Sequence, residues 1–277
     1  GLTGTATATF ENENVGSGKT VSFSKLSLSG EDANNYTFSV PNATASITAK
    51  ALSVSGLSTA NKIYDGTDSA VLVGTAALLA LSTAGAGSSD DGKAYEGDDI
   101  GVSQTSATAT FENKNVGIGK AVSFSGLSLS GDDANNYTFS VPNATASITA
   151  KALSVSAPGI SDKIYDGTNS AGSVTLGDLS GFVGNERVTA TASATALIGT
   201  DVGTYNTTVR YTLGDVANEG LAGNYTLANT ADVEARITVK ALSVSGLSTA
   251  NKIYDGTKSA VLVGTAALLA LSTAGAG

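Results

Sequence analysis

Apolar and polar residues alternate with a period of two along most of this chain, which is the pattern of β-strands with one buried face. Apolar residues occupy even positions in 146–150 and odd positions in 153–155. A shift of one residue turns the buried face of a strand over. The same shift follows Lys50 and Lys240. We therefore expect one strand to leave a domain, and the next to enter its neighbour, at Lys50, Lys151 and Lys240.

Short alternating stretches recur between residues 51 and 151, with turn residues between them. They lie at 51–56, 69–74, 103–111, 119–124, 127–130, 136–141 and 144–151. Such short strands in a segment of about ninety residues are typical of an immunoglobulin-like (Ig-like) β-sandwich. A β-helix would need an internal repeat as short as one coil, which the sequence lacks. We expect no helix apart from one turn at 76–81.

The chain also repeats itself over a long period. The hexapeptide at 62–67 returns at 163–168 and 252–257, so that the tyrosines are 101 and 89 residues apart. This period is far longer than one solenoid coil and matches a whole small β domain. The fold prediction is thus all-β, with tandem Ig-like β-sandwich domains in a linear array. Its parts are a C-terminal half-repeat at 1–50, complete repeats at 51–151 and 152–240, and an N-terminal half-repeat at 241–277.

The sequence starts at Gly1 and contains no methionine. We interpret it as a window from a longer repeat protein or as a processed subunit. The half-repeats 1–50 and 241–277 together supply most of one repeat. In a long array they would be parts of continuous repeats. Alternatively, subunits assemble head to tail, and the tail of one completes the head of the next by strand complementation. The expected partners are therefore neighbouring repeats or identical subunits.

Two tyrosine motifs recur in the repeats, and we expect structural roles for both. In Tyr-Asp-Gly, the glycine permits a tight turn, the aspartate bonds the turn backbone, and the tyrosine buries its ring. In Asn-Tyr-Thr, the tyrosine resembles a tyrosine corner, whose hydroxyl pins the preceding turn. The residues are Tyr64, Asp65, Gly66, Tyr165, Asp166, Gly167, Tyr254, Asp255 and Gly256 in the first motif, and Tyr36, Tyr137 and Tyr225 in the second. A binding role for the first tyrosine is the alternative.

The longer complete repeat differs from the shorter one by 12 residues, in an acidic loop at 85–99. The carboxylates of this loop are Asp90, Asp91, Glu96, Asp98 and Asp99. Clustered carboxylate oxygens are ligands that calcium prefers. The loop is thus a candidate calcium site, although it lacks EF-hand spacing, and an ordinary solvated loop is the alternative. We expect no other cofactor.

Composition narrows the classes of function. The chain has no histidine and no cysteine, so its serines and threonines lack the commonest general base and no thiolate site exists. We expect no enzyme. The net charge of −9 disfavours binding to nucleic acid. The longest apolar run, at 70–81, falls far short of the roughly 20 residues that cross a bilayer, so we expect no membrane span.

Four motifs together resemble the YDG-domain repeats. They are Lys-Ile-Tyr-Asp-Gly-Thr at 62–67, Asn-Val-Gly-x-Gly-Lys at 115–120, Ser-Gly-x-Asp-Ala-x-Asn-Tyr-Thr at 130–138 and Ala-x-Ile-Thr-x-Lys-Ala-Leu at 146–153. Such repeats occur in very large secreted bacterial surface proteins, often of the filamentous-haemagglutinin type, beside bacterial Ig-like repeats. The resemblance implies an extracellular adhesin at the bacterial surface or in a biofilm matrix, and no catalytic residues. The third copy departs from the second motif at 203–206.

These features lead us to expect a structural role. The array would be the stalk or filament of an extracellular bacterial adhesin or a matrix fibre, with domains held at a restricted angle because no flexible linker joins them. The alternative is an adhesive module that binds surface glycans or host proteins through its loops.

Overall fold

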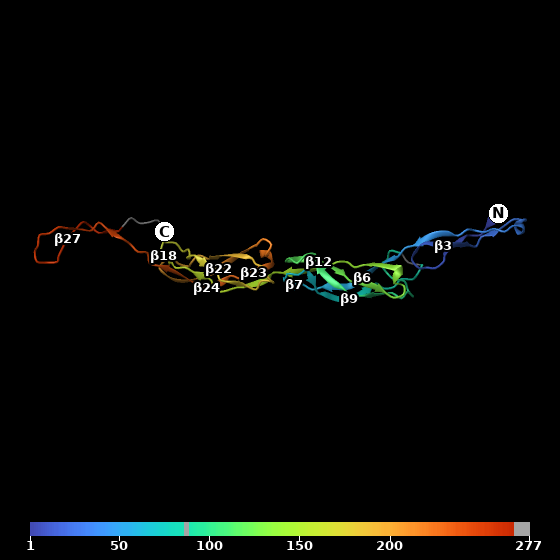
Figure 1. The fold of residues 1–277 in the computed structure, drawn as a ribbon, viewed down its shortest axis with the longest axis horizontal. Coiled ribbons are helices and arrows are strands. Elements are labelled where there is room, and N and C mark those ends of the chain that lie inside the picture. The colour runs from blue at the N-terminus through green and yellow to red at the C-terminus, as the bar shows by residue number, and fades with distance from the viewer. Residues whose placement is uncertain (86–88, 269–277) are drawn as a thin grey trace. The chain divides into compact units, whose positions relative to one another are not determined.

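The computed structural model describes residues 1–85 and 89–268, so residues 86–88 of the acidic loop and the end of the last half-repeat lie outside it. The described residues form strands with three short 3-10 turns, at Ala33–Asn35, Ala134–Asn136 and Ala222–Asn224 (Figure 1). The all-β class predicted from the alternation is thus confirmed. The described backbone contains no α-helix, and none of its helical segments could cross a bilayer.

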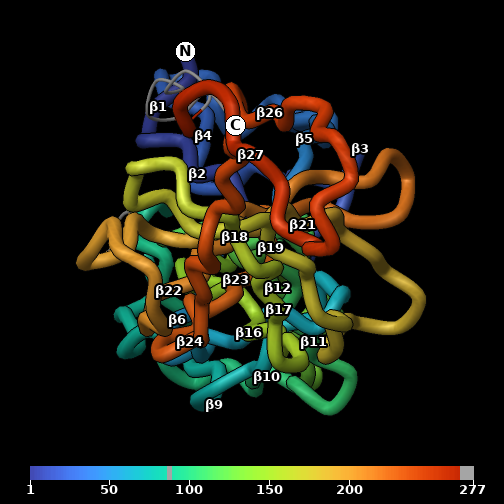
Figure 2. The backbone as a smooth tube through the Cα atoms, turned by 90° about the vertical axis from the view of Figure 1, so that its left-hand side faces the viewer, coloured from blue at the N-terminus to red at the C-terminus, as the bar shows by residue number. Residues whose placement is uncertain are grey.

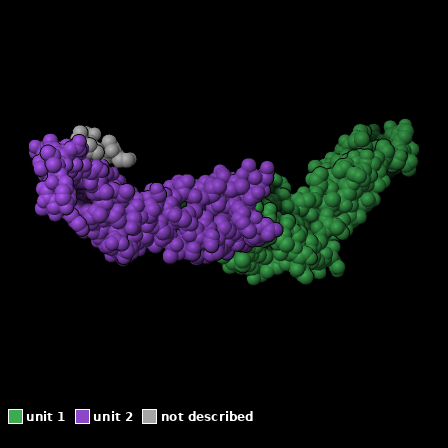
Figure 3. Space-filling view, turned by 60° about the vertical axis from the view of Figure 1, so that its left-hand side comes forward, with its two compact units in different colours: residues 1–62, 67–149 green, residues 63–66, 150–277 purple. Residues whose placement is uncertain are grey.

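The chain forms two compact units (Figure 3). Unit 1 comprises residues 1–62 and 67–149, and unit 2 comprises residues 63–66 and 150–277. The segment 63–66, which carries Tyr64, therefore belongs to unit 2, although it lies within the sequence of the repeat 51–151.

Most of unit 1 is the repeat 51–151, whose strands form three sheets. The first has the order β7 (Lys62–Ile63), β15 (Ala144–Thr149), β12 (Gly117–Ser125), β11 (Thr108–Phe111) and β8 (Ser69–Ala70). The second has the order β14 (Tyr137–Ser140), β6 (Lys50–Thr59) and β9 (Leu72–Leu78), and the third pairs β10 (Gly101–Ser103) with β13 (Ser128–Ser130). Strands β14 and β6 run parallel, with Tyr137 opposite Lys50.

The helical turn predicted at 76–81 is wrong, because β9 continues to Leu78 and residues 79–81 lie in no helix or turn. Strand β9 pairs with β6, and Leu78 lies opposite Val54. Pairing with an established strand outweighs the weak helical preference of a short run of alanine and leucine. The strand predicted at 103–111 is two strands, because residues 104–107 are outside the sheets.

The apolar core of unit 1 follows the predicted alternation. Leu52, Ala94 and Tyr137 form one buried cluster, against which Leu78, Ile100 and Phe139 pack. Ala146 and Ile148 are buried on β15, whereas Leu153 is buried on the next strand of the chain. The inversion of the buried face at Lys151 is therefore present in the structure.

The half-repeat 1–50 also belongs to unit 1. Its strands β2 (Thr7–Phe10), β3 (Gly16–Ser24) and β5 (Ala43–Ile47) form one sheet, and β1 (Leu2–Thr3) pairs with β4 (Ser27–Leu28). Residues 36–39 correspond to strand β14 of the next repeat, but here they form no strand and are exposed.

Unit 2 contains the repeat 152–240. One sheet has the order β18 (Lys163–Ile164), β24 (Thr230–Thr238), β22 (Gly203–Gly214) and β21 (Thr189–Ala194). Strands β22 and β24 lie side by side in Figures 1 and 2. A second sheet has the order β20 (Leu179–Ser180), β16 (Lys151–Val155) and β23 (Tyr225–Leu227), and β17 (Gly159–Ile160) pairs with β19 (Val174–Thr175).

The last half-repeat contributes two short hairpins to unit 2. Strand β25 (Val244–Ser245) pairs with β28 (Ala267–Leu268), and β26 (Ser248–Ala250) pairs with β27 (Val261–Val263). Every residue from Val239 to Leu268 is exposed. Up to Leu268, this half-repeat therefore has no buried core of its own.

The third copy lacks the Gly-x-Gly-Lys motif, and its strand β22 also lacks the bulge that this motif forms in β12. Strand β12 contains a bulge that places Lys120 opposite Ala146. Strand β22 has no bulge at this point, and Tyr205 lies opposite Ala235 instead. Lys120 is 7% exposed and its Nζ donates to Asn113 Oδ1 over 2.7 Å. Tyr205 thus occupies the structural position of the buried lysine.

Candidate functional site

The Lys-Ile-Tyr-Asp-Gly-Thr turn is closed by its own lysine, aspartate and threonine. Lys163 Nζ lies 2.7 Å from Asp166 Oδ1 and donates to the Thr168 carbonyl over 2.9 Å. The Thr168 amide donates to the same aspartate oxygen over 2.9 Å. The hydrogen bonds from Lys163 and from the Thr168 backbone lower the pKa of Asp166 to about 2. The turn is therefore closed without the side chain of its tyrosine.

The other two turns have the same construction. Lys252 Nζ lies 2.8 Å from Asp255 Oδ1 and donates to the Thr257 carbonyl over 2.9 Å. In the first turn, Lys62 Nζ donates to the Thr67 carbonyl over 2.8 Å. Asp65 has the same position in this hexapeptide as Asp166 and Asp255 have in the other two. The glycines have the positive φ that this turn needs, at 81° for Gly66, 81° for Gly167 and 74° for Gly256.

The tyrosines of these three turns have very different surroundings. Tyr64 is 1% exposed, Tyr165 is 39% exposed and Tyr254 is 92% exposed. Because the hexapeptide is the same in all three places, its own sequence does not determine this difference. The elements around each turn determine it.

Tyr64 is buried in unit 2 among residues of the repeat 152–240. Its hydroxyl donates to Glu186, with distances of 2.7 Å to Oε1 and 2.9 Å to Oε2. Its ring meets the ring of Tyr225 edge to face, with centroids 5.5 Å apart. A Cβ atom on Gly66 would lie 2.7 Å from Val183 Cγ1, so the turn approaches its surroundings too closely for a side chain.

Tyr225 completes this site. Its hydroxyl donates to Glu186 Oε2 over 2.7 Å and accepts from the Val183 amide over 3.1 Å. Its ring also meets that of Phe182 at 5.7 Å. Burial, and then the hydrogen bond to Glu186, raises the pKa of Tyr225 to about 12. We call Phe182, Val183, Glu186 and Tyr225 the tyrosine-binding site of unit 2.

The repeat 51–151 contains the same arrangement. The Tyr137 hydroxyl donates to Asp98 and accepts from the Tyr95 amide over 3.0 Å. In both repeats the carboxylate precedes the tyrosine by 39 residues and the amide precedes it by 42. Burial, and then Asp98, raises the pKa of Tyr137 to about 12. Among the described residues, no Tyr-Asp-Gly tyrosine bonds to this pair.

These bonds differ from the expected tyrosine corner. The hydroxyls of Tyr137 and Tyr225 bond to loops about forty residues earlier in the chain, and not to the turns at 134–136 and 222–224 that directly precede them. The physical reason is that each ring points into the core beside an early loop, where a carboxylate and an amide are in reach. Tyr36, in the first half-repeat, is 69% exposed.

The carboxylates of the acidic loop bind separate partners. Asp91 Oδ1 lies 2.9 Å from Lys50 Nζ, and the hydrogen bond from this lysine is the main cause that lowers the pKa of Asp91. The remaining carboxylates accept bonds as follows: Asp90 from Ser89, Glu96 from Thr83, Asp98 from Tyr137, and Asp99 from the Asp132 amide. In the part of the loop that the structure describes, no three of these side chains gather as metal ligands. The calcium site stays a prediction.

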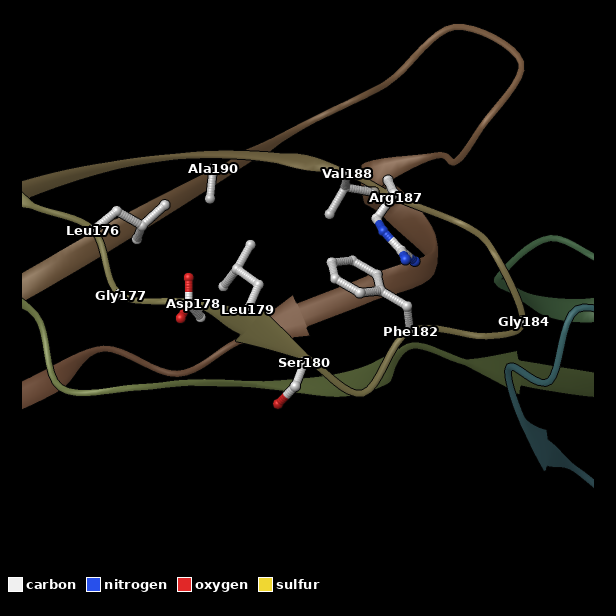
Figure 4. Close-up of a pocket in the computed structure, with 10 residues that line it drawn as sticks. All are labelled: Leu176, Gly177, Asp178, Leu179, Ser180, Phe182, Gly184, Arg187, Val188 and Ala190. Carbon is white, nitrogen blue, oxygen red and sulfur yellow. The ribbon is translucent and has the colours of Figure 1, made fainter.

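A hollow lies on unit 2 beside the tyrosine-binding site (Figure 4). Leu176, Asp178, Phe182, Arg187 and Val188 are among its lining residues. The Arg187 guanidinium lies 5.4 Å from the centroid of the Phe182 ring. Aromatic residues and arginine are enriched at protein–protein interfaces.

Sequence reasoning missed the carboxylates Glu186 and Asp98 as partners of tyrosine. The sequence places Asp98 among the calcium candidates, and no motif marks Glu186. The signal that could have found both is their constant separation of 39 residues from Tyr225 and Tyr137.

Comparison with known protein families gives a match over most of the chain. The sequence model of the YDG domain matches residues 2–45, 48–146 and 149–232, which together make up most of the chain. No curated protein and no solved structure matches.

Proposed function

Because this chain belongs to the YDG-domain family, we propose that it is a tandem array of Ig-like β-sandwich repeats serving as the stalk or filament of an extracellular bacterial adhesin or matrix fibre. The observation that supports this most is the position of Tyr64. This tyrosine lies in the sequence of one repeat and is buried among residues of the next.

A buried connection of this kind suits a protein that carries tension. Pulling the repeats apart would extract Tyr64 from an aromatic contact and from a carboxylate that accepts hydrogen bonds from two phenols. Hydrogen bonds to charged groups are worth about 1.5–3 kcal/mol each. The junction between β15 and β16 is also short, since only Ala150 separates the two strands.

Electron microscopy of the producing cells, with an antibody against this chain, tests the proposal. We expect label along filaments or surface projections outside the cell. Label confined to the cell interior would refute the proposed function.

A second candidate function is an adhesive module that binds glycans or proteins. The hollow beside Phe182 and Arg187 favours it (Figure 4). The full chain on a glycan array distinguishes the candidates, because a pure spacer should bind nothing. Binding that Arg187→Ala abolishes, and that Arg236→Ala in the exposed part of β24 leaves unchanged, would establish the adhesive role.

A further inference from the structure

The pair Tyr137 and Asp98 has the geometry of an occupied site but no Tyr-Asp-Gly tyrosine in it among the described residues. Building on the proposed fibre, we infer that this site in the repeat 51–151 receives Tyr254 from a second copy of the chain. One chain would thereby dock its last half-repeat onto the first complete repeat of the next.

The receiving side follows from the occupied site in unit 2. There, a carboxylate accepts a hydrogen bond from the tyrosine of its own repeat and a second one from Tyr64. Asp98 accepts the first of these bonds, from Tyr137. A carboxylate has about four lone-pair positions, so Asp98 can accept a second phenol in the same way as Glu186 does. Asp98 is only half-buried, and a ring can therefore reach it.

The turn that carries Tyr254 is already formed in the single chain. Tyr254 is 92% exposed and lies in a turn identical in sequence to the one that carries Tyr64. Lys252 donates to the Thr257 carbonyl and hydroxyl over 2.9 and 3.0 Å, and Lys62 makes the same bonds to Thr67 over 2.8 and 3.0 Å. The turn therefore needs no rearrangement before it docks, which lowers the entropic cost of binding.

A second contact lies directly beside the receiving site. The Val15 amide donates to Asn136 Oδ1 over 2.9 Å, and Asn136 Nδ2 donates to Asn14 Oδ1 over 3.1 Å. Asn136 is the neighbour of Tyr137 in the chain. The half-repeat 1–50 thus already contacts the edge of the site that would receive Tyr254.

The two half-repeats have complementary exposed strands. Residues 36–39 correspond to β14, and residues 240–249 correspond to β6, its parallel partner in the repeat 51–151. Both segments are exposed in the single chain. Pairing 240–249 of one copy with 36–39 of another would satisfy both edges. The completed repeat would then contain both Tyr254 and the Asn14–Val15 segment. Tyr254 would contact Asp98 of the following repeat, and the Asn14–Val15 segment contacts Asn136 of the same repeat.

Sedimentation velocity of the full chain over a wide range of concentration tests this inference. We expect oligomers that grow with concentration, and a dissociation constant at least tenfold weaker in Tyr254→Ala. Because Tyr254 is exposed, this change cannot unfold the monomer. Lys258→Asp is the matched control, since it makes residues 241–277 differ in no position from 51–87, and we expect it to associate like the wild type.

A mixing experiment adds a second readout. Asp98→Asn retains the shape of the receiving site but removes its charge, and it should also weaken association. Mixing Tyr254→Ala with Asp98→Asn leaves one intact interface per pair, so the mixture should form dimers that do not grow further. A wild type that stays monomeric, or a Tyr254→Ala variant that associates like the wild type, overturns the inference. Either result would still be compatible with the proposed function, in which the repeats form one continuous chain. The proposed function itself would be refuted by the electron microscopy described above, if the antibody labelled only the cell interior.

Discussion

Replacing Tyr64 by phenylalanine removes a single oxygen from the contact between two repeats. The lost hydroxyl donates its one proton to the carboxylate of Glu186, whose oxygens lie 2.7 and 2.9 Å away. A hydrogen bond to a charged group is worth about 1.5–3 kcal/mol. Glu186 keeps its bond from Tyr225, so it is not left without a partner. We therefore expect Tyr64→Phe to lower the free energy of unfolding of unit 2 by about 1.5 kcal/mol, the low end of this range.

Truncation to alanine should cost more. Tyr64 is 1% exposed and contacts the ring of Tyr225, and removing a buried aromatic ring costs about 3–5 kcal/mol. Urea unfolding followed by hydrogen exchange with mass spectrometry measures both variants, because peptides from β21 and β22 report on unit 2 alone. Tyr165→Phe is the matched control, since Tyr165 is 39% exposed in the same hexapeptide, and its cost should stay below about 0.5 kcal/mol. Equal costs for Tyr64→Phe and Tyr165→Phe would show that the Glu186 contact stabilises nothing.

Three further predictions concern the same turn and site. Gly66→Ala should destabilise unit 2 by about 1–2 kcal/mol in the same assay, because φ is 81° and a side chain has no room, whereas Gly223→Ala, with nothing within 4 Å, should be neutral. The pKa values of Tyr137 and Tyr225 are raised from 10.0 to about 12, so their contribution to stability is complete below pH 10.0 and lost as the pH rises toward 12. In the absorbance of tyrosinate, Tyr225→Phe should remove a component that titrates near pH 12, and loss of a component near pH 10 instead would contradict the buried geometry. The pKa of Asp166 is lowered from 3.8 to about 2, so its contribution is complete well above pH 3.8 and lost as the pH falls toward 2; Asp166→Asn should flatten that part of the stability curve, and an unchanged acid slope would count against the Lys163 pair.

The strands could be predicted from the sequence because a strand with one buried face has apolar and polar residues in alternation. The alternation on β15 and its inversion at Lys151 specify which side chains face the core, and the structure buries Ile148 and Leu153 accordingly. The turn glycines could be predicted for a similar reason, since a positive φ such as that of Gly66 restricts the residue type strongly.

The tyrosine-binding site could not be predicted in the same way. Alternation shows which face of a strand is covered, but not which distant segment covers it. Tyr64 and Glu186 are 122 residues apart, and nothing near either residue indicates the other. Asp98 has several acidic neighbours in the sequence, so a metal site or a solvated loop was the simpler interpretation. Only the comparison of two repeats, each with its carboxylate 39 residues before a tyrosine, carries the information.

The three copies of the Tyr-Asp-Gly turn show that a repeat in this chain is not a self-sufficient unit. The bond from the lysine to the threonine carbonyl closes all three turns, yet the tyrosine is buried only where Glu186 and Tyr225 of a following complete repeat surround it. Part of the stability of the repeat 152–240 therefore depends on the preceding Tyr-Asp-Gly turn, as in other linear arrays whose stability is a sum of intrinsic and interface terms. The contact between repeats consists of a buried ring and a hydrogen bond to a charged group. A repeat that follows a Tyr-Asp-Gly turn should therefore unfold at a higher denaturant concentration than the same repeat without such a turn. Each repeat would then stabilise the repeat that follows it in the chain, because its turn packs into the core of that next repeat.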